Sequence, residues 1–377
     1  LYNYTPYQPN QAALNAGYGT APCGAYGNRN FWKLFSDWFG STRANRPYTN
    51  LKWSYEYLDG SKSGIRPRDN TVGMDTSTIV YNNTLYSFHY DLTTGTLNTS
   101  YADAQGWHSA VLDGGGGSNG RTSSNVGKMS SVTIYNNALH IFYFDATNTS
   151  LRHAWLNSAG VWSFEVLDGQ TGAPSGSSGD IGYGSSATSF GQTLQLFYYD
   201  NSSGNLRHAW YSDGSGWKFE NLDGDYGSVA GRNGNIGQSP KVIEYQGGLQ
   251  LFYYDATSGN LRHAWTTTAG WKFENLDGDA GSIGRYSSNV GQSPFSLVHQ
   301  GTLYIFYRDV NSGLMRYSWA DSSGWRFANL EGSPHTDSGL VSNTGFTPSA
   351  ATFQNSLQLF YFDNDARALR HAWGVSR

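Results

Sequence analysis

The sequence predicts an all-β protein, a six-bladed β-propeller with four antiparallel strands in each blade. Three observations lead to this prediction. The first is composition: only 14% of the residues are charged, 16% are aromatic, and 47 of the 377 are glycine. Such a composition suits short strands joined by tight turns better than it suits helical bundles. The other two observations are sequence repeats that share one period.

The repeats divide the chain into six units. One repeat is an aromatic-rich run that ends in Asp, and the other is Trp followed five residues later by Leu-Asp-Gly or a close variant. Successive copies of both repeats are 54 or 55 residues apart, so residues 51–377 form six units without remainder. The aspartates are Asp91, Asp145, Asp200, Asp255, Asp309 and Asp363, and the tryptophans are Trp53, Trp107, Trp162, Trp217, Trp271 and Trp325.

One unit illustrates the strands expected in each blade. The unit that begins at Gln238 has four strand-like runs, 239–245, 249–254, 261–265 and 271–276, with turn residues between them. Four short antiparallel strands in a repeat of roughly 40–50 residues are typical of a propeller blade. The second run is almost continuously apolar, as expected of an inner strand between neighbouring blades.

The two ends of the repeated region are predicted to share a blade. The first Trp motif, at 53–60, precedes the first complete unit, whereas the last unit stops after Trp373 without one. We therefore expect the strand around Trp53 to be the fourth strand of the last blade. This arrangement closes the ring and leaves no open sheet edge.

Residues 1–50 do not repeat and are predicted to form a separate N-terminal extension. Within it, 28–40 reads as a short amphipathic helix rich in aromatic residues and ended by Gly40. Its aromatic face is expected to dock on the propeller or on an upstream domain. No Lys/Arg-rich face accompanies it, so insertion into a membrane surface is not expected.

Charge and composition exclude several classes of protein. The net charge of −4 and the lack of basic blocks argue against nucleic-acid binding. No apolar run approaches the ~20 residues of a membrane-spanning helix.

Cys23 is the only cysteine, so it cannot form a disulfide within the chain. A start at Leu1 and many Tyr, Thr, Ser and Asn predict a processed protein that is secreted or extracellular.

The third strand of each unit carries the candidate binding residues, in the pattern Arg-His-Ala-Trp or a variant of it. Because side chains alternate along a strand, His263 and Trp265 share one face while Arg262 projects to the other. An exposed indole offers an apolar face to a sugar ring, and Arg and His suit its hydroxyls. The candidate sugar-binding residues are Arg152, His153, Trp155, Arg207, His208, Trp210, Arg262, His263, Trp265, Arg316, Trp319, Arg370, His371 and Trp373.

Structural roles remain open for the same residues. The tryptophans can pack between blades. The arginines can tie blades together by pairing with the Asp at the second-strand end or with Glu165, Glu220 and Glu274. The repeated aspartates are expected to accept hydrogen bonds from the backbone of their own turns.

The pair Asp223 and Asp225 hints at a calcium loop but lacks the spaced ligands of an EF-hand, so neither a metal nor another cofactor is expected.

No catalytic motif is evident. The sequence lacks a Gly-x-Ser-x-Gly, a His-Glu-x-x-His, a P-loop and a cysteine nucleophile with a matching histidine. Nothing marks two carboxylates as the pair that a glycosidase needs. Repeated copies of Arg, His and Trp instead indicate several equivalent shallow sites that act through avidity. The prediction is a non-catalytic chain that binds carbohydrate. A protein-interaction scaffold, or a glycosidase or lyase using one face of the propeller, remains an alternative.

The repeats resemble those of a known family. Leu-x-Leu-Phe, Leu-Arg-His-Ala-Trp and Gly-Trp-x-Phe-Glu-x-Leu-Asp-Gly are similar to the repeats of sugar-binding β-propeller lectins, of the PLL-like kind, over residues 51–377. This resemblance implies glycan partners, fucosylated or other cell-surface or cell-wall saccharides, bound between blades. Similar six-bladed lectins hold fucose with a second-strand Arg and a third-strand Glu. Here those places hold His140 and His153 in one unit and Gln and His in others, which departs from the fucose pattern.

The N-terminal run resembles a second group. Residues 4–10, 23–31 and 37–40 are similar to the tail of a module in secreted, cell-wall-associated proteins of Gram-positive bacteria. This resemblance covers about 40 residues. It implies that the propeller is the recognition module of a secreted or cell-surface bacterial protein.

Overall fold

The described part of the chain is all-β. The computed structural model describes residues 70–321 and 324–330, together with the backbone of 346–353, 356–363 and 368–375. The chain divides into two compact units, Leu1–Tyr55 and Glu56–Arg377, and every described residue belongs to the second. The predicted helix over 28–40, the boundary after residue 50 and the closing strand around Trp53 lie outside the described residues.

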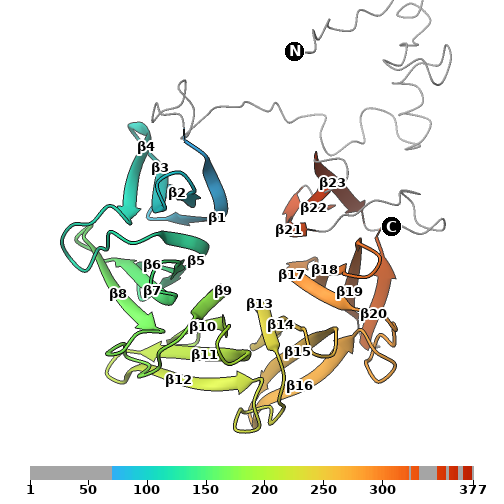
Figure 1. Cartoon of the computed structure of the whole chain (residues 1–377). Coiled ribbons are helices and arrows are strands. Elements are labelled where there is room, and N and C mark those ends of the chain that lie inside the picture. The colour runs from blue at the N-terminus through green and yellow to red at the C-terminus, as the bar shows by residue number, and fades with distance from the viewer. Residues whose placement is uncertain (1–69, 322–323, 331–345, 354–355, 364–367, 376–377) are drawn as a thin grey trace, which may run out of the picture. The chain divides into compact units, whose positions relative to one another are not determined.

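The described strands form five four-stranded antiparallel sheets and one three-stranded sheet (Figure 1), with no helix among the described residues. In each sheet, strands that follow one another in the sequence are hydrogen-bonded neighbours. We number the sheets 1 to 6 in chain order. Sheet 1 has β1 (Val72–Tyr81), β2 (Thr84–Asp91), β3 (Thr96–Asp103) and β4 (Gly106–Asp113); sheet 2 has β5 (Val126–Tyr135), β6 (Ala138–Asp145), β7 (Ser150–Leu156) and β8 (Trp162–Asp168); sheet 3 has β9 (Ile181–Phe190), β10 (Thr193–Asp200), β11 (Asn205–Ser212) and β12 (Gly216–Asp223); sheet 4 has β13 (Ile236–Tyr245), β14 (Gly248–Asp255), β15 (Asn260–Thr267) and β16 (Gly270–Asp277); sheet 5 has β17 (Val290–His299), β18 (Thr302–Asp309), β19 (Leu314–Asp321) and β20 (Gly324–Asn329); and sheet 6 has β21 (Phe346–Phe353), β22 (Ser356–Asp363) and β23 (Ala368–Val375).

The hydrophobic core lies between consecutive sheets. One cluster joins Phe142 and Leu151 of sheet 2 to Leu196 and Ala209 of sheet 3, and similar clusters lie at the other described junctions. Second strands such as β6 are almost fully buried, as the apolar runs predict. In Figure 1 the first strand of each of sheets 1 to 5 lies innermost and the fourth outermost. Successive sheets therefore share one interface type, which the 54-residue repeat reproduces.

A glycine near the start of the first strand in sheets 2 to 5 allows neighbouring sheets to approach closely. Gly182 has a φ of 115°, and a Cβ added to it would lie 2.8 Å from the Cβ of Leu151 in the preceding sheet. Gly127, Gly237 and Gly291 meet the equivalent leucines in the same way. These positions need glycine both for the backbone conformation and for the close contact.

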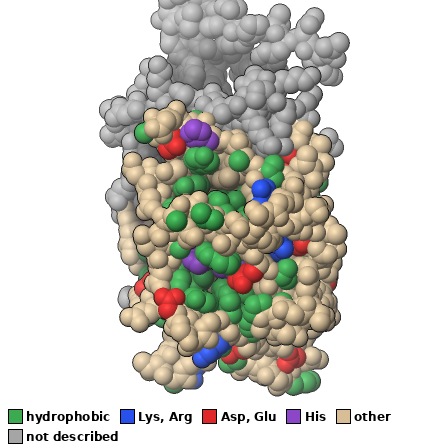
Figure 2. Space-filling model, turned by 90° about the vertical axis from the view of Figure 1, so that its left-hand side faces the viewer, with side chains coloured by type: hydrophobic (Ala, Val, Ile, Leu, Met, Phe, Trp, Pro, Cys, Tyr) green, Lys and Arg blue, Asp and Glu red, His purple; other side chains and the backbone are tan. Residues whose placement is uncertain are grey.

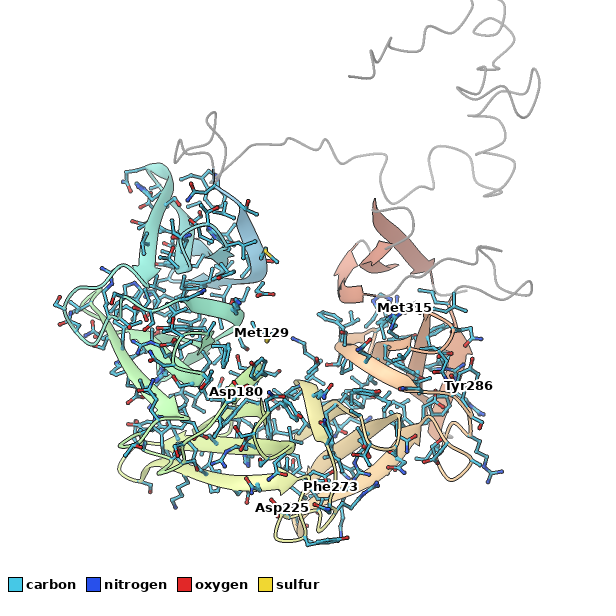
Figure 3. The ribbon with its side chains drawn as sticks, viewed as in Figure 1. Met129, Asp180, Asp225, Phe273, Tyr286 and Met315 are labelled. Carbon is cyan, nitrogen blue, oxygen red and sulfur yellow. The ribbon has the colours of Figure 1, made fainter. Side chains whose placement is uncertain are left out.

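A β-bulge interrupts each described first strand in sheets 1 to 5. Its residue has a φ between 51° and 60° and is Asp75, Met129, Gly184, Ser239 or Ser293. The strand register shifts at each of these places. The bulge residues and their neighbours line a pocket of about 550 Å³ on the inner side of the first strands. Met129 is labelled there in Figure 3. The bulges bend the inner strands around this pocket.

Candidate functional site

The third-strand arginines of sheets 2 to 5 are buried at the junctions between sheets. Arg152 of β7 donates from Nε to Oδ2 of Asp113, which ends β4 of the preceding sheet, at 3.0 Å. The Tyr143 hydroxyl donates to the same oxygen at 2.6 Å. Arg152 is 4% exposed and Asp113 is fully buried. The same arrangement, at 2.9 to 3.0 Å, joins Arg207 to Asp168, Arg262 to Asp223 and Arg316 to Asp277.

These contacts give the arginines a structural role and revise the predicted partner. The carboxylate across the junction belongs to the Leu-Asp-Gly motif, not to the second-strand Asp or to Glu165. The second-strand Asp145 instead accepts hydrogen bonds from the backbone of Thr147 and Asn148 in its own turn, as predicted. Because the guanidinium groups are buried and paired, the proposed binding site excludes them.

The third-strand histidines form a ladder with aromatic rings on the opposite face of the strand. His153 lies between Phe142 and Trp155, with ring centroids 4.6 and 5.0 Å away. Its Nδ1 lies 2.8 Å from Oε1 of Glu165, the residue opposite it in β8. The pairs His208–Glu220 and His263–Glu274 repeat this contact at 2.7 Å. We call each His with its Glu partner and its neighbouring Trp a set. Each set thus holds a carboxylate beside stacked rings.

Burial keeps these histidines neutral. Desolvation lowers the pKa of His153 below its ordinary value, although the Glu165 carboxylate acts in the opposite direction. The pKa values of His208 and His263 are lowered for the same reason. His140, whose Nδ1 lies 2.9 Å from Nε2 of His153, has its pKa lowered by burial to about 3. At neutral pH the Nδ1–H of His153 therefore donates to Glu165 while the ring carries no charge.

A fourth-strand tryptophan of the next sheet completes each set. Trp217 of β12 packs edge-to-face on His153, at 5.6 Å and 83° between rings. Its Nε1–H donates to Oε1 of Glu165 at 3.2 Å, so this oxygen accepts hydrogen bonds from both sheets. Trp271 and Trp325 pack in the same way on His208 and His263. These three tryptophans therefore pack between sheets, which is the structural role left open above, while Trp217 stays partly exposed.

At the junction of sheets 2 and 3 these residues face a pocket of about 370 Å³. Trp155, His153 and Glu165 line it from sheet 2. Trp217, Tyr211 and Asp213 line it from sheet 3. Figure 2 shows hydrophobic side chains along the face that carries β4 and β8, with histidine and acidic side chains among them. The volume of the pocket, with its mixture of ring faces and carboxylates, suits one or two sugar rings.

The other predicted residues occupy equivalent places with differences between sheets. Trp210 and Trp265 stack on their histidines as Trp155 does. In sheet 5 a tyrosine and an alanine replace the His–Glu pair, and Trp319 stacks on Tyr317. In sheet 1 the pair is Thr99 and Ala110. For sheet 6 the backbone of β23 places Arg370, His371 and Trp373 in the same register, but their side chains lie outside the described part.

Of the residues that line the pocket, only His153 and Trp155 were among the predicted site residues. Glu165, Tyr211 and Asp213 are lining residues outside that prediction that bear on ligand binding. Glu165 was assigned to an arginine, although counting outward from the β7–β8 turn places it opposite His153. That cross-strand count is a signal that could have found it. Tyr211 and Asp213 occur in one unit only, so no repeat marked them.

The described residues show no group of three or more His, Cys, Asp or Glu side chains able to hold a metal ion. Likewise, no helix suited in length and apolarity to cross a membrane occurs among them.

Comparison with known proteins identified similar folds only among solved structures. No protein-family model and no curated protein matches the chain, so both sequence resemblances stay predictions. The fucose-specific lectin from Aleuria aurantia is 13% identical, with a TM-score of 0.41 over 71% of this chain and 81% of the lectin. An alpha-L-arabinofuranosidase catalytic domain from Coprinopsis cinerea is 14% identical, with a TM-score of 0.41 over 69% and 92%. A subtype N10 neuraminidase-like protein of A/little yellow-shouldered bat/Guatemala/060/2010 is 9% identical, with a TM-score of 0.45 over 82% of this chain and 96% of that protein.

These similar structures correct one prediction. They include several glycoside hydrolases, among them arabinofuranosidases and a beta-fructofuranosidase from Bombyx mori. The prediction that the chain is not an enzyme is contradicted by this finding. It had rested on the absence of short motifs and of a marked carboxylate pair. The fold shows why that argument fails, because Glu165 and Asp213 are far apart in sequence and yet line one pocket.

Proposed function

We propose that the chain is a six-bladed carbohydrate-binding β-propeller that holds sugars in pockets between neighbouring blades. In this proposal sheets 1 to 6 are the blades, and the strand around Trp53 completes the last one. The observation that carries the proposal is the junction pocket in which Trp155, Trp217 and Glu165 meet. Partly exposed indoles beside an accessible carboxylate can contact both the apolar and the hydroxyl faces of a sugar.

Within the pocket each group has a distinct task. The Trp155 ring offers an apolar face to the C–H side of a sugar. The Glu165 side chain is 31% exposed and accepts hydrogen bonds from sugar hydroxyls. His153 and the Trp217 indole N–H hold that carboxylate in place from two sheets. Orientation of Glu165 before the ligand arrives reduces the entropy cost of binding.

The repeat provides several such sites. The His–Glu–Trp set is complete in sheets 2, 3 and 4, and the Arg-His-Ala-Trp sequence of β23 fits it in sheet 6. Sheets 1 and 5 lack the pair and are expected to bind weakly. Several weak sites on one rigid body bind a multivalent target through avidity. Fucosylated or other cell-surface or cell-wall glycans are the proposed targets, and the chain is the recognition module of a secreted or cell-surface bacterial protein.

The proposal is tested by a glycan array on the chain and on two variants. A triple variant, Glu165→Gln, Glu220→Gln and Glu274→Gln, removes the three charges and keeps the side-chain size. We expect it to lose most of the signal for the best glycan, because an amide binds hydroxyls less strongly than a carboxylate does. Glu244→Gln, an exposed acid outside the sets, is the control. Equal binding by the triple variant and the parent chain would refute the proposed sites.

Hydrolysis of a glycoside is a second candidate function. The observation that favours it is that Glu165 and Asp213 line the same pocket, as two carboxylates must in a glycosidase. Release of reducing sugar from an oligosaccharide, abolished in both Glu165→Gln and Asp213→Asn, would establish it. Binding without release would leave the carbohydrate-binding function alone.

A further inference from the structure

The junction of sheets 2 and 3, where the pocket lies, differs in its residues from the other junctions. Its two additional residues, Tyr211 and Asp213, come from the end of β11 and the turn after it. The equivalent positions in sheet 4 are Thr266 and Thr268. Among the junctions of sheets 2 to 5, only the junction of sheets 2 and 3 has an aromatic and an acidic residue at these two positions. A difference of this kind at the rim of a pocket alters which ligand it selects.

Two carboxylates face this pocket without a cation beside them. Glu165 and Asp213 both line it, and no Lys or Arg is among its lining residues. Asp213 accepts a hydrogen bond from the Asn136 side chain. None of the ion pairs among the described residues joins a Lys or Arg to Glu165 or Asp213. His153 donates to Glu165 but is neutral, so it leaves the negative charge uncompensated.

Aromatic rings surround these carboxylates. Tyr211 lies between Trp217, at 5.4 Å, and Tyr135, at 6.0 Å between ring centroids. Trp155 lines the opposite side from sheet 2. Ring faces attract cations through their quadrupole, and aromatic side chains recognise organic ammonium ligands in this way. Carboxylates and aromatic faces together favour a positively charged group and disfavour an anion.

We propose that this pocket selects a sugar that carries a free ammonium group, such as a 2-amino-2-deoxy hexose. This inference rests on the proposed function and adds the ligand class of one site. The sugar ring lies against Trp155, and its ammonium group pairs with Glu165 and Asp213. Uronic and sialic acids are repelled by the same carboxylates. The junctions of sheets 3 and 4 and of sheets 4 and 5 keep the Trp and Glu residues but not Asp213, so they do not share this selectivity.

The test is a calorimetric titration of the whole chain with four monosaccharides: glucosamine, N-acetylglucosamine, glucose and glucuronate. The pH is set so that the glucosamine amine is protonated. We expect one site that binds glucosamine at least about tenfold more tightly than the two neutral sugars, and no glucuronate binding there, because only glucosamine brings a cation to the carboxylates. The glucosamine preference should weaken as salt is added.

Two variants and one control make the test specific. Asp213 lies in an exposed turn, where Asn is readily accommodated, and Glu165→Gln keeps the side-chain size. Asp213→Asn and Glu165→Gln should each reduce the glucosamine preference at least about threefold. The Glu244→Gln control changes the charge equally outside the pocket and should leave the preference unchanged. Equal affinity for glucosamine and glucose, or a preference that survives both pocket variants, overturns the inference while the proposed function stands. Failure of every monosaccharide to bind, together with an empty glycan array, overturns both.

Discussion

At the scale of single residues, the buried histidines make the stability of the fold depend on pH. Burial holds the pKa of His140 near 3, below the unfolded value of about 6.5. The folded state therefore keeps His140 neutral, whereas the unfolded chain takes up a proton below about pH 6.5. The stabilisation from His140 is fully present above that pH and decreases as the pH falls toward 3, by about 1.4 kcal/mol per pH unit.

His140→Gln tests this dependence with a residue that the repeat already uses. Gln195 and Gln250 occupy the same place beside His208 and His263 in the next two sheets. We expect the variant to lose about 1.4 kcal/mol per pH unit less than the parent between pH 6 and pH 4. Urea unfolding at each pH measures it. His108→Gln, at an exposed histidine, serves as the control, and parallel slopes for parent and His140→Gln would contradict the account.

Substitution of Asp113 tests the contacts that join sheets 1 and 2. Asp113→Ala removes the acceptor of both Arg152 and Tyr143 and leaves a buried guanidinium without a counter-charge. We expect a loss of about 3–5 kcal/mol in the free energy of unfolding. Tyr143→Phe removes one hydrogen bond only and should cost about 1–2 kcal/mol. Denaturant titration compares the two, and similar losses would argue against a charge-based junction.

Prediction of side-chain placement from the sequence succeeded where residues repeat. His153 and Trp155 were placed on one face of a strand from alternation alone, and the structure stacks them. The partner of Arg152 was wrong, because two aspartates recur in every unit and a period cannot tell which one lies across a sheet junction. Nothing in the sequence marked Asp213, because its place in the pocket depends on residues of sheet 2 that are distant from it in sequence.

At the scale of elements, glycines in the first strands set the spacing between sheets. Gly182→Ala places a Cβ 2.8 Å from Leu151, whereas Gly106, with a similar φ of 114°, has open space around it. Both substitutions strain the backbone, so Gly106→Ala is the matched control. Only Gly182→Ala also forces the sheets apart, which should cost about 1–3 kcal/mol more. Thermal or urea unfolding measures this difference, and equal losses would show that the close contact is unimportant.

Strand prediction succeeded for the second strands and failed at the bulges of the first strands. The apolar run 249–254 became β14, Gly248–Asp255, with nearly the same ends. The run expected from 239 begins three residues earlier, at Ile236 in β13. Ser239, with a φ of 52°, interrupts the regular alternation there. A period-two pattern cannot extend across a residue that adds one position to the strand.

At the scale of the whole molecule, the described sheets repeat one interface and one pattern of polar residues. The same His–Glu contact recurs in sheets 2, 3 and 4, and the same Arg–Asp contact recurs at four junctions. In the proposed function this repeated interface offers repeated binding positions, and residues that differ between sheets, such as Asp213, make these positions unequal. The central claim is that these junction pockets bind carbohydrate.

The measurement that tests this claim most directly is a calorimetric titration with the best ligand from the glycan array, analysed for stoichiometry. The account predicts about three to six sites per chain, with sheets 2, 3, 4 and 6 binding more tightly than sheets 1 and 5. It also predicts fewer sites in the triple variant Glu165→Gln, Glu220→Gln and Glu274→Gln. Stoichiometry that is unchanged in this variant, or a glycan array without any bound sugar, would contradict it.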